Sequence, residues 1–252
     1  MISLQSLERF ISILESFSTE KPELSLGELV EKTNLPKPTV YRIAEAMVKY
    51  NILNKDRKTL RYKIGVRLFE LGSIYLASME LRDLAFPYLD WLHQQTGESI
   101  HLGILDGNEV VSIEGLESAH SLRLKVWIGK RAPLHCTAIG KAILAFLPPD
   151  RQDRIISKIS LNAFTKRTIT TRGKLKTELQ KIKEEGLAWD LGEHEEGIQC
   201  IGAPVFDRKG EVVASVSISG PAVRMTEQKI KEYIPLLLKA TNDISKKLGY
   251  SS

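Results

Sequence analysis

The chain has 252 residues, of which 42% are hydrophobic and 27% charged, and its formal net charge is +5 at pH 7. This length suggests two domains, and the composition excludes an intrinsically disordered or fibrous protein. No apolar run approaches the roughly 18 residues that a membrane-spanning helix requires. Residues 1–5 lack the basic and apolar segments of a secretory signal, and two cysteines do not make a disulfide framework. We therefore expect a cytoplasmic protein with reduced thiols and no membrane contact.

The positive charge is concentrated in one window of the sequence. Residues 35–65 hold eight basic and two acidic side chains, so this window alone carries a net charge of +6. Such a density predicts a surface that binds a polyanion such as nucleic acid. On charge alone, a solvated basic face is the alternative interpretation.

The first third of the chain begins with three predicted helices. Residues 4–18 carry apolar side chains at helical spacing. A short second helix is expected after the capping box Ser25–Glu28 and before Asn34, because Asn tolerates the left-handed backbone of a tight turn. A third helix is expected from Pro36 to about Tyr50. Two helices joined by a turn of three to four residues predict a helix-turn-helix.

A hairpin wing is predicted directly after the third helix. Two short apolar segments, at 52–54 and 60–64, flank the polar residues 55–59, which can form a turn. The tip of this hairpin is basic, so it extends the positive surface of the preceding helix.

DNA contacts are expected at the exposed N-terminal end of the third helix, the part of this motif that enters the major groove. Arg and Tyr side chains there can reach base edges, whereas Lys and Thr more readily hold phosphates. Basic side chains on the wing would contact the backbone or the minor groove. A trihelical packing module that binds nothing is the alternative. The candidate DNA-binding residues are Lys37, Thr39, Tyr41, Arg42, Arg57, Lys58 and Arg61.

A helix over residues 66–80 is expected to link the first domain, residues 1–65, to a second one over residues 81–252. Turn signals at 106–108 and 207–210 join antiparallel strands. The predicted class is mixed α+β, with an antiparallel sheet and helices packed against it. The helices are expected from 81 to about 95, at 137–147, 150–159 and 173–185, and from 226, and the strands at 122–126, 187–191, 197–206 and 211–219.

The last predicted strand carries different side chains on its two faces. The even-numbered residues from 212 to 218 are apolar and are expected in the core, whereas Ser215, Ser217 and Ser219 share the other face. Hydroxyl groups can donate hydrogen bonds to an anionic or carbonyl ligand, and Ser is a poor strand former. The serine face is therefore a candidate ligand-binding surface, with an ordinary solvated sheet face as the alternative.

Together these segments resemble the IclR family of bacterial transcriptional regulators over nearly the whole chain. Each similar string is short, but all of them occur in the order found in the family, which makes the resemblance specific. The strings are Ser6–Arg9, Leu35–Arg42, Arg61–Gly65, Thr96–Leu102, Pro133–His135 with Ala138–Ala142, and Val216–Pro221.

The resemblance implies a GAF-like effector-binding domain with its pocket on the sheet, beside the helix at 138–147. It implies ligand contacts from backbone amides at a helix start, which favour a carboxylate. The chain would then be a homodimeric or homotetrameric repressor of a catabolic operon that binds double-stranded operator DNA and responds to a small organic acid. The implied ligand contacts are Ala138, Ile139, Asp190, Cys200, Ser217 and Ser219.

Two other classes of function remain as alternatives. The dipeptide His135-Cys136 and the pair His194 and Cys200 suggest a redox- or metal-sensing regulator on the same scaffold. An enzyme fused to a DNA-binding module is the other, but the chain contains no HExxH, GxSxG, P-loop or CxxC motif. We therefore predict no enzymatic activity, no cofactor and neither catalytic nor metal-binding residues.

Overall fold

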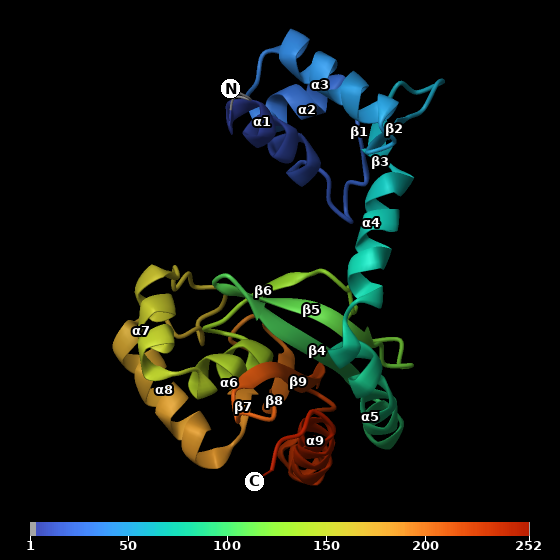
Figure 1. The fold of residues 1–252 in the computed structure, drawn as a ribbon. Coiled ribbons are helices and arrows are strands. Elements are labelled where there is room, and N and C mark those ends of the chain that lie inside the picture. Colours follow the sequence, from blue (N-terminus) through green and yellow to red (C-terminus); the bar gives the residue numbers. More distant parts are fainter. Residues whose placement is uncertain (1–3, 252) are drawn as a thin grey trace. The chain divides into compact units, whose positions relative to one another are not determined.

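The computed structural model describes residues 4–251. The chain divides into two compact units, Met1–Met79 and Glu80–Ser252, and each has its own hydrophobic core (Figure 1). Within the described part of the chain, no helix is long and apolar enough to cross a membrane.

The first unit is a winged helix-turn-helix followed by a further helix. Its small antiparallel sheet has the strand order β1-β3-β2. Buried side chains from all three helices and all three strands form one core, centred on Ile13, Val40 and Tyr62. The elements are α1 (Leu4–Glu15), β1 (Glu23–Leu24), α2 (Leu26–Thr33), α3 (Lys37–Lys49), β2 (Leu53–Lys55), β3 (Tyr62–Ile64) and α4 (Val66–Ala77).

The ends of these helices agree with the predicted signals, with small differences. The Ser25 hydroxyl accepts from the Glu28 amide and the Glu28 carboxylate accepts from the Ser25 amide at 2.8 Å, so the capping box is confirmed. Asn34 adopts the left-handed conformation with φ +54°. Pro36 is the N-cap of α3 rather than its first residue. The first helix ends at Glu15, earlier than predicted, because the chain must turn before β1 pairs with β3.

The second unit is an α+β domain, which confirms the predicted fold class. A six-stranded antiparallel sheet has the order β6-β5-β4-β9-β8-β7. Helices α6, α7 and α8 lie on one face and α5 and α9 on the other (Figure 1). The elements are α5 (Glu80–Thr96), β4 (Ser99–Asp106), β5 (Glu109–Leu116), β6 (Arg131–Pro133), α6 (Ala138–Phe146), α7 (Pro149–Lys158), α8 (Arg172–Glu185), β7 (Ala188–Asp190), β8 (Ile198–Phe206), β9 (Val212–Pro221) and α9 (Glu227–Lys247).

The strand predicted at 122–126 is wrong, because residues 117–130, which we call the strap, are irregular. Side chains satisfy the backbone groups of its central part, and only its C-terminal end is bonded to a strand, through Ser112 of β5. The Ser99 hydroxyl and the Arg224 guanidinium donate to the carbonyls of residues 124 and 122, at 3.0 and 2.7 Å. The Glu117 carboxylate accepts from the amide of residue 126. The alternation in sequence therefore does not correspond to a strand, and Leu122, which it placed on the apolar face, is 60% exposed.

Both faces of β9 are covered by helices. Its even-numbered residues from 214 to 218 are fully buried, as predicted. The serine face is buried as well, which rules out the solvated sheet face. The cause is α6, since Gly202 pairs with Ser217 and a Cβ on Gly202 would lie 2.8 Å from the backbone of Ala138.

Candidate functional site

The start of α3 presents the predicted DNA-contacting side chains on the surface of the first unit. Lys37 is its first residue, and Lys37, Tyr41 and Arg42 are exposed, whereas Thr39 is half-buried. Within residues 4–251, neither Lys37 nor Arg42 forms an ion pair with a carboxylate. Both cations are therefore available to an anionic partner.

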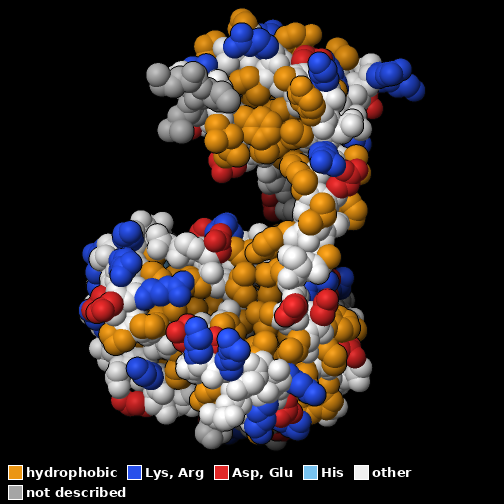
Figure 2. Space-filling view, viewed as in Figure 1, with side chains coloured by type: hydrophobic (Ala, Val, Ile, Leu, Met, Phe, Trp, Pro, Cys, Tyr) orange, Lys and Arg blue, Asp and Glu red, His pale blue; other side chains and the backbone are white. Residues whose placement is uncertain are grey.

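The tip of the wing is held in a tight turn that projects two more cations. One Asp56 oxygen accepts from the amides of Lys58 and Thr59, at 2.8 and 2.7 Å, and these bonds lower the pKa of Asp56. Leu60 closes the turn with φ +56°. Arg57 and Lys58 are exposed at this tip, where Figure 2 shows basic side chains. A turn fixed in this way presents charge with little loss of conformational entropy on binding.

A polar cluster fixes the wing to α3. Glu45 of α3 accepts from the Lys55 ammonium at 2.6 Å and from the Tyr62 hydroxyl at 2.7 Å, and both bonds lower its pKa. The Lys55 ammonium also lies 5.4 Å from the centroid of the Tyr41 ring. Sequence reasoning missed Glu45 and Lys55, because no local motif pairs residues on a helix and the following hairpin.

Arg61 is placed differently from the other predicted DNA contacts. Its guanidinium donates to Glu28 at 2.8 Å and to the carbonyl of Glu23 at 3.1 Å, next to the capping box of α2. Hydrogen bonds from Lys21 and Ser25, with the Arg61 charge nearby, lower the pKa of Glu28 to about 2. Because one nitrogen of its guanidinium is bonded within the first unit, we now expect Arg61 mainly to hold the wing in place rather than to contact DNA.

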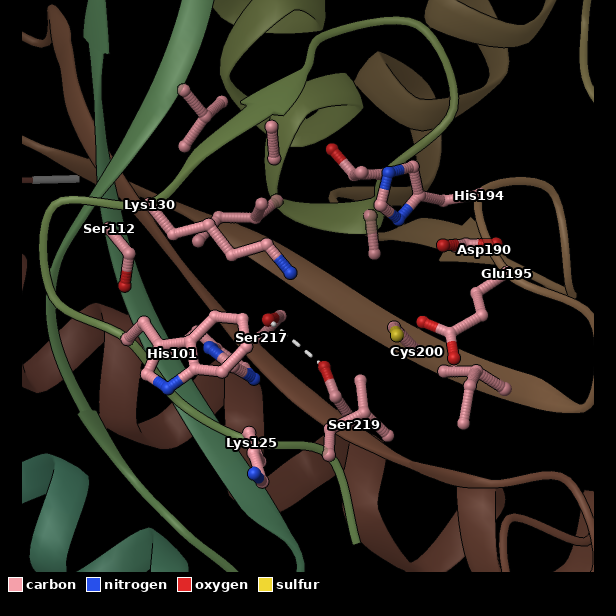
Figure 3. Close-up of a pocket in the computed structure, with 18 residues that line it drawn as sticks. His101, Ser112, Lys125, Lys130, Asp190, His194, Glu195, Cys200, Ser217 and Ser219 are labelled. Carbon is pink, nitrogen blue, oxygen red and sulfur yellow. Dashed lines mark hydrogen bonds between the residues drawn. The ribbon is translucent and has the colours of Figure 1, made fainter. Parts of the chain in front are cut away.

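A cavity lies on the serine face of the large sheet, within the second unit. The start of α6, the strap and the loop after β7 enclose it (Figure 3). Its volume is about 120 Å³. One water molecule needs about 10–15 Å³ of such space, so the cavity can hold a small molecule. All six predicted ligand contacts line it, namely Ala138, Ile139, Asp190, Cys200, Ser217 and Ser219.

The N-terminus of α6 offers free backbone donors to this cavity. Thr137 caps the helix, and its hydroxyl accepts from the Gly140 amide at 3.1 Å. The first intrahelical bond runs from the Lys141 amide to the Thr137 carbonyl. The amides of Ala138 and Ile139 therefore precede the helical hydrogen bonds and carry the partial positive charge of the helix start. This arrangement favours an anionic ligand group.

The strands supply hydroxyl and thiol groups to the cavity floor. The hydroxyls of Ser217 and Ser219 lie 3.4 Å apart on β9, and Cys200 of β8 pairs directly with Ser219. Ser215 does not line the cavity, because it donates to the carbonyl of Ala203 within the sheet. The floor can therefore donate to, or accept from, ligand oxygens.

The end of β7 and the loop after it carry acidic groups to the cavity. Asp190 is buried, which raises its pKa, and it accepts from the Glu193 amide at 2.7 Å. Figure 3 shows Glu195 close to Asp190 and His194. Carboxylates at this wall accept hydrogen bonds, so they suit hydroxyl groups of a ligand.

A buried ion pair connects this loop to α6 behind the cavity. The Lys141 side chain is fully buried and pairs with Glu193, and Glu178 of α8 lies 3.5 Å from its ammonium. The hydroxyl of Thr168 donates to the Glu193 carbonyl at 2.6 Å. Burial raises the pKa of Glu193, and the Lys141 charge opposes this increase. The pair holds the loop against the helix whose amides face the cavity.

Several cavity residues escaped the sequence analysis. His101 lines the cavity, and burial together with the Lys130 charge lowers its pKa to about 4, so its ring is neutral at pH 7. The alternation of β4 could have placed this side chain on the cavity face. Trp127 and the strap lysines had no such signal, because the strap has no regular structure. The missed polar or aromatic lining residues are His101, Ser112, Lys125, Trp127, Lys130, Thr137 and Glu195, whereas His194 had been considered only for a redox or metal site.

Both thiols lie in the interior of the second unit. Burial is the main cause that raises the pKa of Cys136, to about 12, and it also raises the pKa of Cys200. Because the thiolate is the reactive form, such cysteines react slowly with oxidants and bind metals poorly at neutral pH. Over residues 4–251, no group of three or more His, Cys, Asp or Glu side chains could hold a metal ion.

The first unit is a winged helix-turn-helix with unpaired cations, and the second is an α+β domain with a polar cavity. This combination defines DNA-binding regulators that carry a ligand-binding domain in the same chain. Residues 6–57 match the IclR helix-turn-helix domain, and residues 73–246 match the family described as bacterial transcriptional regulator IclR C-terminal. The chain belongs to the IclR family of DNA-binding transcriptional regulators, which confirms the resemblance and excludes the enzyme alternative.

Similar proteins include regulators and solved structures of this family. The chain is 36% identical to the HTH-type transcriptional regulator KdgR of Escherichia coli over 98% of its length and 94% of the relative. It is 36% identical in sequence to Thermotoga maritima IclR, whose crystal structure aligns with a TM-score of 0.80. The alignment covers 98% of this chain and 100% of that chain. An IclR homolog from Microbacterium hydrocarbonoxydans complexed with 4-hydroxybenzoate is 25% identical, with a TM-score of 0.82 over 96% and 98% of the chains.

Proposed function

We propose that this protein is a cytoplasmic repressor that controls a catabolic operon and responds to a small organic acid. The observation that carries the proposal is the cavity in the second unit, which is lined both by the first residues of α6 and by hydroxyls on β9. A carboxylate suits the amides, and a body with hydroxyl or keto groups suits the serines and Asp190.

The size of the cavity supports a small effector. Its volume of about 120 Å³ is several times what one water molecule needs. The Microbacterium homolog, which has a similar fold, is complexed with the small acid 4-hydroxybenzoate. The regulator would have one arrangement that binds DNA well and another that binds it poorly. The effector would change DNA affinity only as far as its own affinity differs between these two arrangements.

Exposed apolar side chains on α4 support a homo-oligomer. None of its residues is buried, and Phe69 and Ile74 are 74% and 68% exposed. A helix with so many exposed apolar residues usually meets a partner surface. We propose that a second copy of the chain covers this helix, in a homodimer or homotetramer, so that two winged helices read a roughly palindromic operator.

Binding to operator DNA should separate the roles of Arg42 and Lys58. We expect Arg42→Ala to weaken binding to the cognate operator by about 1–3 kcal/mol while affinity for scrambled DNA changes little, because a base contact is lost. We expect Lys58→Ala to weaken binding to both sequences alike and to reduce the salt dependence by about one counterion. Fluorescence anisotropy with both duplexes over a range of salt concentrations measures these effects.

Equal losses on cognate and scrambled duplexes for both variants would contradict the assigned roles. Arg61→Ala is a useful comparison, since its guanidinium is bonded to Glu28. It should lower the thermal stability of the first unit and leave the salt dependence near that of the unsubstituted protein.

The effector response should depend on the serines of the cavity floor. We expect Ser217→Ala and Ser219→Ala to abolish the release of operator DNA by the effector while operator affinity without effector is unchanged, because these hydroxyls lie in the second unit. A thermal-shift screen against keto, sugar and aromatic acids identifies the effector, since binding raises the melting temperature. Ser215→Ala is the matched control on the same face. Full response of both cavity variants would place the ligand elsewhere.

A redox- or metal-sensing regulator is the remaining alternative. The buried thiols and their raised pKa values weigh against it. Operator binding that is the same with and without a chelator or a mild oxidant is the expected result. A change in affinity under either condition would favour the alternative.

A further inference from the structure

The strap delivers an unpaired cation to the wall of the cavity. Lys130 is its last residue and lines the cavity together with Leu124, Lys125 and Trp127. Figure 3 shows the Lys130 ammonium directed into the cavity. Within residues 4–251, Lys130 forms no ion pair with a carboxylate. A cation left unpaired at a cavity wall is available to a ligand.

The backbone that carries Lys130 is held firmly in place. The Lys130 amide donates to the Trp127 carbonyl at 3.2 Å, which closes a turn in which Gly129 has φ +84°. The last two residues of the turn are bonded to the backbone of Ser112 of β5. The Gly129 amide donates to the Ser112 carbonyl at 2.7 Å, and the Ser112 amide donates to the Lys130 carbonyl at 2.9 Å. The Lys130 ammonium lies 5.1 Å from the centroid of the Trp127 ring. The backbone from which the Lys130 side chain extends is therefore in place before a ligand arrives.

The charge of Lys130 acts across the cavity. Burial is the larger cause that lowers the pKa values of His101 and His194, and the Lys130 charge lowers both further. These two rings belong to different walls, one on β4 and one on the loop after β7. Glu195 lies on that same loop, and Asp190 ends the strand before it. The cavity thus has a cationic strap on one side and acidic side chains on another. A ligand with a carboxylate and hydroxyl groups can pair its carboxylate with the strap and donate its hydroxyls to the acidic side chains.

We propose that Lys130 contacts the anionic group of the effector and makes the cavity select acids over their uncharged analogues. This inference rests on the proposed function, because it concerns the same cavity. The amides of α6 supply only partial charges, which an uncharged carbonyl oxygen also satisfies, whereas the ammonium supplies a full charge. An amide in place of the carboxylate loses the charge-assisted bond, and we expect its affinity to fall at least about tenfold.

The test compares acids with their primary amides. The full-length protein is titrated by calorimetry with 4-hydroxybenzoate, D-gluconate, D-galacturonate and pyruvate, and with the amide of each acid. The expected result is that at least one acid binds and that its amide binds at least tenfold more weakly. Equal affinity of an acid and its amide would overturn the role of Lys130 and leave the proposed function intact. Failure of every acid to bind would count against both.

Variants then assign the selectivity to one side chain. Lys130→Met should lose at least tenfold in affinity for the acid and keep its affinity for the amide, whereas Lys130→Arg should retain most of the acid affinity. Lys209→Met, at an exposed hairpin turn outside the cavity, is the matched control. The assignment to Lys130 would be overturned if only Lys125→Met lost affinity for the acid. It would also be overturned if Lys130→Met still preferred the acid to its amide as strongly as the unsubstituted protein does.

A second measurement needs no ligand and distinguishes local misfolding from loss of charge. In Lys130→Met, the pKa values of His101 and His194 should both rise, as measured by NMR titration of the imidazole protons, while the melting temperature stays within a few degrees. Unchanged histidine pKa values in a folded variant would show that the ammonium does not face the cavity, and would contradict the proposal.

Discussion

Gly202→Ala should abolish the effector response and leave operator binding without effector intact. A Cβ at this position would lie 2.8 Å from the carbonyl carbon and oxygen of Ala138 and 3.2 Å from the Ile139 amide nitrogen. These are backbone atoms, so the whole start of α6 must move away from the sheet. The two amides that face the cavity would move with it, and displacements of this kind cost binding far more than the added methyl group suggests.

Effector binding by calorimetry and operator binding by anisotropy give the two readouts for this variant. Gly173→Ala is the matched control, because a Cβ there meets nothing within 4 Å and its backbone is helical. We expect this control to be neutral or slightly stabilising. An effector affinity of Gly202→Ala equal to that of the control would show that the start of α6 does not bind the ligand.

Lys141→Met should destabilise the second unit by about 3 kcal/mol, a typical cost when one partner of a buried ion pair is removed. Met fills much of the Lys volume, so the main loss is the charge that compensates Glu193. Chemical denaturation followed by tryptophan fluorescence measures the free energy of unfolding. Effector affinity should fall as well, because the pair holds the loop whose Glu193 amide donates to the Asp190 carboxylate.

The pH dependence of this variant has a definite sign. Burial already raises the pKa of Glu193 in the folded state, and without Lys141 the pKa must rise further. The folded state then binds more protons than the unfolded state between the two pKa values, so stability is lost as the pH rises through the folded pKa. We expect the destabilisation to be larger at pH 8 than at pH 5.

The double variant Lys141→Met with Glu193→Gln provides the control for that argument. It removes the uncompensated charge, so it should recover part of the lost stability and lose the pH dependence. If the double variant were as unstable as Lys141→Met at every pH, the loss would come from packing and not from charge.

Local signals in the sequence determined the first unit and most of the second. The capping box at Ser25, the left-handed Asn34 and the apolar spacing of α3 each act within a few residues, so they can be recognised from the sequence alone. The alternation along β9 likewise placed Ser217 and Ser219 on one face. The family resemblance then added the backbone amides of α6, which no side-chain pattern reveals.

Only the tertiary structure decided which charged side chains form ion pairs within the chain and which remain available to a partner. In the sequence, Arg61 and Lys58 are both cations of the predicted wing. In the structure, however, Arg61 is bonded to Glu28, which lies 33 residues earlier in the chain. The strap was predicted as a strand, although side chains from distant elements hold it. Long-range hydrogen bonds and ion pairs depend on how the elements pack, and a single sequence contains no periodic signal for them. For this reason Lys130 and the Lys141 pair became visible only in the folded chain.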